Sequence, residues 1–180
     1  MKKIVIIGPN GSGKSSLAAY VAKRYGLPHI SCGDALRNIS EYPEIQSLVG
    51  DYDVHSGVLM DDQTLTTLVS TLIAHRGTPE GWVIDGTPRR PLQAMRMLAE
   101  FPPTHVIVLQ ASLSVIEQRI GNRRYDFNAR KMYRLGIDEI PDGAVLSTRP
   151  DDDIDIIRRR YALYEAETAP TIRAIQTLMN

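Results

Sequence analysis

Residues 4–17 read IVIIGPNGSGKSSL, in which a short apolar run leads into a glycine-rich loop and then into a helix-compatible stretch. The segment from Gly8 to Ser15 matches the pattern G-x-x-x-x-G-K-[ST]. In such a loop backbone N–H groups turn toward phosphates, the lysine reaches the β- and γ-phosphates, and the serine hydroxyl joins a magnesium shell. Because a predicted strand precedes the loop and a predicted helix follows it, the stretch predicts a nucleoside triphosphate site. The residues expected to bind the triphosphate here are Gly8, Asn10, Gly11, Ser12, Gly13, Lys14, Ser15 and Ser16.

The composition is that of an ordinary globular domain. The chain has 180 residues, 43% hydrophobic and 23% charged, a length that suits one domain and is marginal for two. Its 21 basic and 21 acidic side chains cancel, which argues against a general affinity for nucleic acid or an anionic membrane. One cysteine, Cys32, excludes an internal disulfide and a cysteine-based zinc site. Since no apolar run approaches the ~20 residues of a membrane span, and the start reads as a buried strand and not a signal peptide, we expect a cytoplasmic protein.

Short apolar runs alternate with amphipathic stretches along the chain. Strands that alternate with helices predict a parallel sheet covered on both faces. Asp34 is placed to cap the second helix, and residues 130–134 are expected in a solvated helix. Trp82, Met95 and Met97 are expected in the core. The expected strands are residues 2–8, 27–31, 81–86 and 104–111, and the expected helices are 15–26, 33–40, 61–77, 90–101, 112–124 and 151–179.

The glycine-rich loop does not by itself name a reaction. Many ABC-type ATPases have the loop sequence PNGSGKS. They also need an LSGGQ-like signature and an acidic pair after a long apolar strand, and neither is present in this sequence. GTPases need a base-reading motif of the N-K-x-D kind, which is also absent. The choice of reaction therefore depends on the rest of the chain.

Further segments resemble motifs of the adenylate kinase family of nucleoside monophosphate kinases. With the loop they cover about residues 1–175, and their conjunction is far more specific than the loop alone. The matching segments are SCGDALR at 31–37 (family S-T-G-D-x-L-R), SGVLMDD at 56–62 (S-G-x-L-V-x-D), GWVIDGTPRR at 81–90 with Gln93 (G-F-I-L-D-G-F-P-R-T and a Gln), Arg119-Ile120 with Arg123-Arg124, and the downstream run from Arg149 to Tyr164 (R-x-D-D and R-x-R-L-x-x-Y).

The resemblance implies a fold and its moving parts. The expected fold is the P-loop α/β fold, with three αβα layers around a parallel sheet of about four strands in the order 2-3-1-4. A single domain is expected over residues 1–180. Within it, residues 31–62 are expected to form a flap that binds the acceptor, and residues 124–149 a lid.

The resemblance also implies roles for individual side chains. Phosphoryl transfer between two nucleotides needs positioning and stabilisation of spread negative charge, so arginines should converge from several segments. Counterparts of Arg37 and Arg89 hold the acceptor's α-phosphate, and that of Arg119 lies against the donor's adenine. The implied catalytic set is Lys14, Arg89, Arg123, Arg149 and Arg160. The triphosphate at the glycine-rich loop is implied to be ATP, with Arg119 and Arg123 also on it. The implied AMP set is Cys32, Gly33, Arg37, Met60, Gly86, Arg89 and Gln93, and Ser15 and Asp85 are implied at Mg²⁺, partly through water.

The acceptor is less firmly indicated than the donor. Gln93 favours AMP, because its amide offers one donor and one acceptor to an adenine edge. Arg90, Cys32 and Met60 depart from the family pattern near the base. The expected function is transfer of the γ-phosphoryl of Mg-ATP to AMP, which gives two ADP. Two alternatives remain: a kinase for another monophosphate, or a nucleotide-binding regulatory protein with little transfer.

The end of the chain bears on assembly. Family members continue past the long last helix with one more strand and a helix, whereas this sequence stops at Asn180. A bare sheet edge is therefore expected. We expect a monomer, with a dimer through that edge as the alternative.

Overall fold

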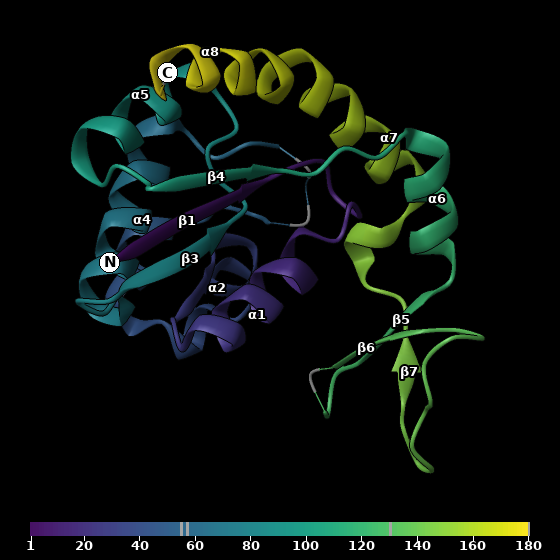
Figure 1. Ribbon diagram of the computed structural model, residues 1–180. Coiled ribbons are helices and arrows are strands. Elements are labelled where there is room, and N and C mark those ends of the chain that lie inside the picture. The colour runs from purple at the N-terminus through teal and green to yellow at the C-terminus, as the bar shows by residue number, and fades with distance from the viewer. Residues whose placement is uncertain (55, 57, 130, 180) are drawn as a thin grey trace.

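A four-stranded parallel sheet stands at the centre of the computed structural model, which describes residues 1–54, 56, 58–129 and 131–179 (Figure 1). The strand order is β2-β3-β1-β4, so β1 lies between β3 and β4. The register places Ile4 beside Val83 on one side and beside His105 on the other. These findings confirm the predicted α/β class and strand order. The strands are β1 (Lys2–Ile7), β2 (His29–Ser31), β3 (Gly81–Asp85) and β4 (His105–Val108).

Helices bury both faces of the sheet, as the near-continuous apolar strands require. On one face, Ala18 and Val21 of helix α1 pack against Ile6 of β1. On the other face lies the larger core, where Leu72 and Ile84 are fully buried. The elements on this larger face are α2 (Cys32–Arg37), the 3₁₀ turns η1 (Ile39–Glu41) and η2 (Pro43–Ile45), α3 (Gln46–Val49), α4 (Asp62–Arg76), α5 (Pro91–Glu100) and α8 (Ala169–Met179), whereas α1 spans Lys14–Tyr25.

A small antiparallel sheet projects from the main body (Figure 1). It follows helix α6 (Leu113–Gly121), and its order is β6-β5-β7. The prediction of a helix over residues 130–134 was wrong, because β6 (Lys131–Arg134) pairs with β5 (Arg123–Asp126); Arg130 itself lies outside the described residues. Within β6, Tyr133 is buried, Met132 is half-buried, and the end residues Lys131 and Arg134 are exposed. The third strand, β7, spans Leu146–Ser147.

The last part of the chain is one curved helical rod (Figure 1). It begins at Ile154, later than the predicted 151, because a 3₁₀ turn occupies Pro150–Asp152 (η3) and Asp153 then caps the helix through the N–H of Asp155 at 2.9 Å. A π-helical turn separates its two α-helical parts. The segments are α7 (Ile154–Leu163), η4 (Tyr164–Thr168) and α8. None of the helices in the described part of the chain is long and apolar enough to cross a bilayer.

Two smaller expectations about side chains were wrong. Ser31, and not Asp34, caps helix α2: its hydroxyl accepts the Asp34 N–H at 3.4 Å, while the Asp34 carboxylate accepts from Asn38 at 3.0 Å. Met95 is 60% exposed, because its position on α5 faces away from the side that buries Ala94 and Met97. Trp82 and Met97 are in the core, as predicted.

Candidate active site

A cavity of about 140 Å³ opens at the carboxyl end of the parallel strands, where ligands bind in open α/β sheets. The ends of β2 and β3 contribute Ser31 and Asp85, the loop after β1 contributes Asn10, and the first residue of α1 is Lys14. Arg149, next to the small sheet, lines the same cavity. The cavity is therefore bounded by segments from nearly the whole length of the chain.

The glycine-rich loop is shaped for close backbone approach. Gly11 has φ +81°, and a Cβ there would lie 2.9 Å from Ile116 and from Ile120, so only glycine fits. Gly13, with φ +98°, stands at the start of helix α1 and turns the chain into it. Lys14 reaches back over the loop, and its Nζ donates to the Pro9 carbonyl at 3.0 Å. The loop thus presents a helix N-terminus and an ammonium to the cavity.

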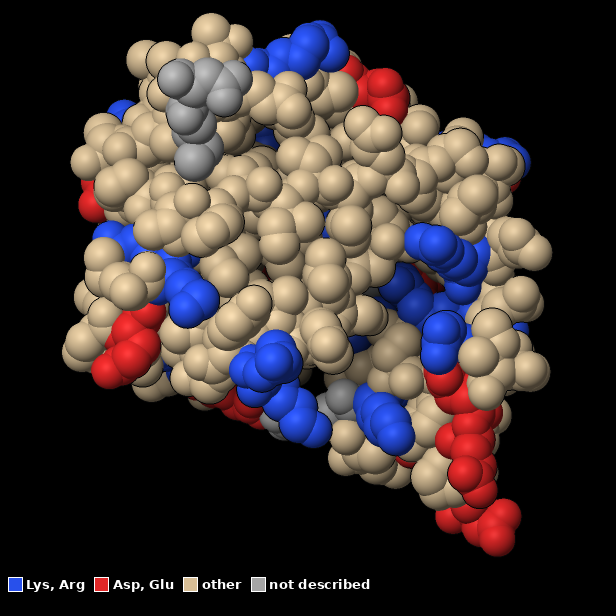
Figure 2. Space-filling model, in the orientation of Figure 1, with Lys and Arg blue, Asp and Glu red and all other residues tan. Residues whose placement is uncertain are grey.

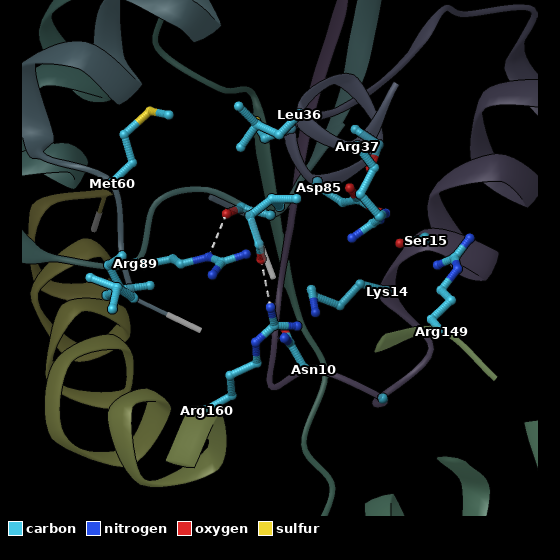
Figure 3. A pocket seen from close by; sticks show the side chains of 18 of the residues that line it. Asn10, Lys14, Ser15, Leu36, Arg37, Met60, Asp85, Arg89, Arg149 and Arg160 are labelled. Atoms are coloured by element: carbon cyan, nitrogen blue, oxygen red, sulfur yellow. Dashed lines mark hydrogen bonds between the residues drawn. The ribbon is translucent and has the colours of Figure 1, made fainter. Parts of the chain in front are cut away.

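Positive charge is concentrated in this cavity although the whole chain is neutral. In Figure 3 the labelled basic side chains point toward one another around the space in front of the loop. Figure 2 shows blue side chains gathered where the small sheet meets the main body. Among the described residues that line the cavity, the carboxylates are Asp85 and Asp152, and the cations are Lys14, Arg37, Arg89, Arg123, Arg149 and Arg160.

The crowding of cations changes their proton affinity. Burial of the Lys14 ammonium, reinforced by repulsion from Arg89, Arg123 and Arg160 and opposed by Asp85, lowers its pKa to about 7. Burial also lowers the pKa of Arg89. A bound polyanion would relieve both effects, because opposite charge favours the protonated form.

Several of the arginines are held by neighbours. Arg123 pairs with Asp152, donating from Nε at 3.2 Å and from Nη2. The Arg149 guanidinium lies over the Tyr125 ring, 4.0 Å from its centroid. Arg160 donates to the Val54 carbonyl at 2.8 Å, one of the dashed lines in Figure 3. These contacts preorganise the guanidinium groups around the cavity.

Asp85 is the buried carboxylate of the site. It is 2% exposed, its Oδ2 lies 3.5 Å from His29 Nε2, and this oxygen has no hydrogen-bond partner among the described residues. Burial acts to raise the pKa of Asp85, but polar interactions with His29, Ser15 and Ser31 outweigh it and lower the pKa. The described residues contain no group of three or more His, Cys, Asp or Glu arranged around a metal.

The predicted acceptor residues meet at the end of the cavity near β2 and β3. Arg89 Nε donates to the Gly86 carbonyl at 2.8 Å, and its backbone N–H donates to Gln93 Oε1 at 2.7 Å. Cys32 is buried beside Gly86, and burial raises the pKa of its thiol to about 12, so it contributes shape and not reactivity. Met60 and Gln93 are also buried against this end.

Not every predicted site residue lines the cavity. Arg119 lies outside it and donates to the Ser12 carbonyl at 3.1 Å, bracing the loop. The predicted residues that line it are Asn10, Gly11, Lys14, Ser15, Cys32, Gly33, Arg37, Met60, Asp85, Gly86, Arg89, Gln93, Arg123, Arg149 and Arg160, and those that do not are Gly8, Ser12, Gly13, Ser16 and Arg119. The lining residues that were not among the predicted site residues are Ser31, Leu36, Tyr52, Val54, Val58, Leu59, Leu65, Ile120, Asp152 and Ile157.

Comparison with known proteins agrees with this geometry. The adenylate kinase family model matches residues 6–178. An adenylate kinase of Blochmanniella pennsylvanica (strain BPEN) is 34% identical over 182 aligned positions, which cover 96% of this chain and 83% of that protein. An adenylate kinase of Giardia intestinalis is 34% identical over 169 positions, covering 90% of this chain and 66% of that protein. The predicted resemblance is confirmed, and the chain belongs to the adenylate kinase family.

Proposed function

We propose that this protein transfers the γ-phosphoryl group of Mg²⁺-bound ATP to AMP, reversibly, and so forms two ADP. The observation that carries the proposal is the convergence of Lys14 and five arginines on one cavity that opens between the glycine-rich loop and the Gln93 end. Two polyanions that repel each other have to be brought together in this reaction, and such a set of cations stabilises them.

The donor half is proposed at the glycine-rich loop. ATP phosphates take the place beside the loop, with Lys14 on the β- and γ-phosphates and Ser15 toward the metal. Arg123 and Arg160 face the transferring group from β5 and α7, and Arg119, which braces Ser12, lies toward the donor base. In the step itself, the bond between the γ-phosphorus and the bridging β–γ oxygen breaks, and an α-phosphate oxygen of AMP forms the new bond.

The acceptor half is proposed at the opposite end of the cavity. Arg37 and Arg89 hold the α-phosphate of AMP, and Gln93 faces the base among Cys32 and Met60. An acceptor phosphate is already ionised at neutral pH, so the protein needs to supply no strong general base. Its contribution is position and charge.

Mg²⁺ is proposed at Asp85 and Ser15. The buried Asp85 Oδ2, which has no hydrogen-bond partner among the described residues, fits a cation or its water shell, and Ser15 lines the same cavity. A small protein donor set is what Mg²⁺ normally uses when phosphates supply further ligands. When bound, the ion neutralises charge on the β- and γ-phosphates.

Residues 31–62 and 124–149 are proposed as the flap and the lid. Val54 from the first segment and Arg149 from the second line the cavity together with Lys14. Movement of both segments toward the loop would exclude water and so favour transfer over hydrolysis. We also propose a monomeric, cytoplasmic protein.

One experiment tests the proposal directly. Product formation from Mg-ATP is measured with AMP, GMP, CMP, UMP and dTMP in turn, beside a control without acceptor. ADP formation that depends on AMP supports the proposal. Transfer only to another monophosphate would keep the kinase and change the assigned acceptor. ATP binding without transfer to any acceptor would overturn the enzyme assignment.

A further inference from the structure

The side-chain amide of Gln93 is held from both sides. Its Oε1 accepts the backbone N–H of Arg89 at 2.7 Å, and its Nε2 donates to Asp62 Oδ1 at 2.8 Å. Gln93 is 3% exposed and yet lines the cavity at the proposed acceptor end. Each amide atom retains capacity for a further partner, since oxygen has a second lone pair and nitrogen a second hydrogen.

The two neighbours of Gln93 distinguish its oxygen from its nitrogen. A free glutamine amide presents its two ends interchangeably, because half a turn about its last torsion exchanges them. In this site that turn would set the NH₂ group against the Arg89 N–H and the carbonyl oxygen against the Asp62 carboxylate. Both hydrogen bonds would be lost and like groups would face each other.

Asp62 is itself fixed in place. It is the first residue of helix α4, directly after the cap Asp61, whose carboxylate accepts the Thr64 N–H at 2.9 Å. The Arg90 guanidinium lies 3.5 Å from the same Asp62 oxygen that Gln93 contacts, and 3.8 Å from Glu167. The Asp62 oxygen that accepts from the Gln93 amide is therefore also held by a cation.

The orientation of the amide matters because purines differ at the edge that it would meet. A 6-aminopurine offers an N6–H donor and an N1 acceptor, whereas a 6-oxopurine offers an O6 acceptor and an N1–H donor. An amide with a fixed orientation pairs with only one of them. An amide that is free to turn pairs with either.

We infer that Asp62 determines the purine specificity of the acceptor site, by locking the Gln93 amide in the orientation that selects a 6-aminopurine monophosphate and rejects a 6-oxopurine one. This inference rests on the proposed placement of the acceptor base at Gln93. Asp62 is a positioning residue here, because it acts through Gln93 and not on the substrate.

The first test needs only the wild-type protein and three monophosphates. AMP, IMP and purine ribonucleoside 5′-monophosphate, which has no substituent at C6, are compared by kcat/KM and by calorimetric Kd. If the amide is locked, IMP should have the lowest kcat/KM of the three, about a hundredfold or more below that of AMP. With IMP, a donor would face a donor and an acceptor would face an acceptor, whereas the unsubstituted purine merely loses one hydrogen bond. An amide that turns freely would place IMP close to AMP and above the unsubstituted purine, and this order would overturn the inference.

The second test removes the lock. The Asp62→Asn side chain can either donate to or accept from the Gln93 amide, so that amide can adopt both orientations. The ratio of kcat/KM for AMP to that for IMP should then fall by about tenfold or more. Asp61→Asn is the matched control: it changes net charge equally and retains a capping side chain, and the Asp61 carboxylate accepts the Thr64 N–H whereas the Gln93 amide donates to Asp62. The ratio of kcat/KM for AMP to that for IMP should therefore match wild type in this variant. Equal losses for AMP and IMP in Asp62→Asn would mean a merely structural role and would overturn the inference.

The two proposals can fail separately. Kd values for the three monophosphates give the order of binding even if no phosphoryl transfer occurs. Absent transfer with AMP bound far above IMP would overturn the kinase and keep the lock. Active transfer with IMP accepted like AMP would keep the kinase and overturn the lock.

Discussion

The Thr168 hydroxyl donates to the Arg89 carbonyl at 3.0 Å, so the C-terminal helical rod that carries Arg160 also holds the segment that carries Arg89. Thr168 is 4% exposed and ends the π-helical turn η4. Turns of this kind inside helices are frequent at functional sites. Here the turn connects the proposed donor and acceptor halves through one buried hydrogen bond.

Replacing Thr168 by valine should loosen that connection. The variant keeps the shape and leaves a buried carbonyl without its donor, so we expect a loss of about 1 kcal/mol in the free energy of unfolding. KM for AMP should rise several-fold, while KM for ATP stays near wild type. Thr177→Val is the control. Thr177 lies on the same rod and its hydroxyl also donates to a carbonyl, but that carbonyl belongs to Arg173 of the rod itself, and Thr177 is exposed. Equal KM values for AMP in both variants would contradict the positioning role.

Arg89→Ala should abolish transfer and leave ATP binding nearly unchanged. Arg89 lies at the acceptor end, and removal of a guanidinium that compensates phosphate charge costs about 10³-fold or more in rate. Single-turnover kinetics and calorimetric titration with ATP measure the two effects separately. Arg173→Ala, an exposed change on α8, should leave both as in wild type. If transfer survives in Arg89→Ala, the acceptor site is misplaced.

Lys14 should take up a proton when ATP binds. Its pKa of about 7 in the free protein leaves much of the amine neutral at about pH 8, and anionic phosphates raise that pKa. Calorimetry in two buffers of different ionisation enthalpy should therefore show proton uptake near pH 8. The uptake should vanish in Lys14→Met and persist in Lys23→Met, an exposed change on the same helix.

The same pKa fixes the sign of a stability effect. Between about pH 7 and the unfolded value of 10.5, the unfolded chain binds a proton at Lys14 that the folded chain does not. The free energy of unfolding therefore gains a contribution that increases with pH across this window. Subtracting the curve of Lys14→Met from that of wild type isolates it. A difference that is flat or falls with pH would contradict the lowered pKa.

Local pattern was sufficient for the central part of the fold. The β-branched run before the glycine-rich loop and the amphipathic stretch after it predicted β1 and α1, and repetition of that pattern predicted the parallel sheet. The basic residues to which the resemblance gave roles on the nucleotides also line one cavity, apart from Arg119. Motifs identify such residues because the reaction constrains their side-chain type.

Contacts between segments that are distant in the chain could not be predicted from the sequence. Asp62 and Gln93 form a hydrogen bond only because α4 and α5 pack side by side. The type of neither residue predicts this partner. The prediction of a helix at 130–134 fails because the four residues of the strand at 131–134 carry too little periodicity to distinguish a strand from a helix. Ser31 and Asp34 are both good N-cap residues, so composition alone did not separate the cap from the first turn.

Tyr125 should matter for the rate of transfer although it carries no charge. The Arg149 guanidinium stacks 4.0 Å from the Tyr125 ring centroid, and Phe127 packs edge-on against the same ring, with the two ring centroids 4.8 Å apart. Tyr125→Leu removes the face on which the cation rests, a contact worth about 0.5–2 kcal/mol. We expect kcat to fall by about three- to tenfold, with KM for AMP unchanged, because Arg149 is proposed to act on the transferring group.

The conservative variant Tyr125→Phe separates this role from others. It keeps the ring and loses only the hydroxyl, so its kcat should stay close to wild type while that of Tyr125→Leu falls. An equal fall in kcat in both variants would assign the effect to the hydroxyl. An unchanged kcat in Tyr125→Leu would mean that Arg149 holds its position without the ring. Thermal unfolding of both variants shows whether the small sheet tolerates the change, since Tyr125 pairs with Met132 and Ser147 in its central strand.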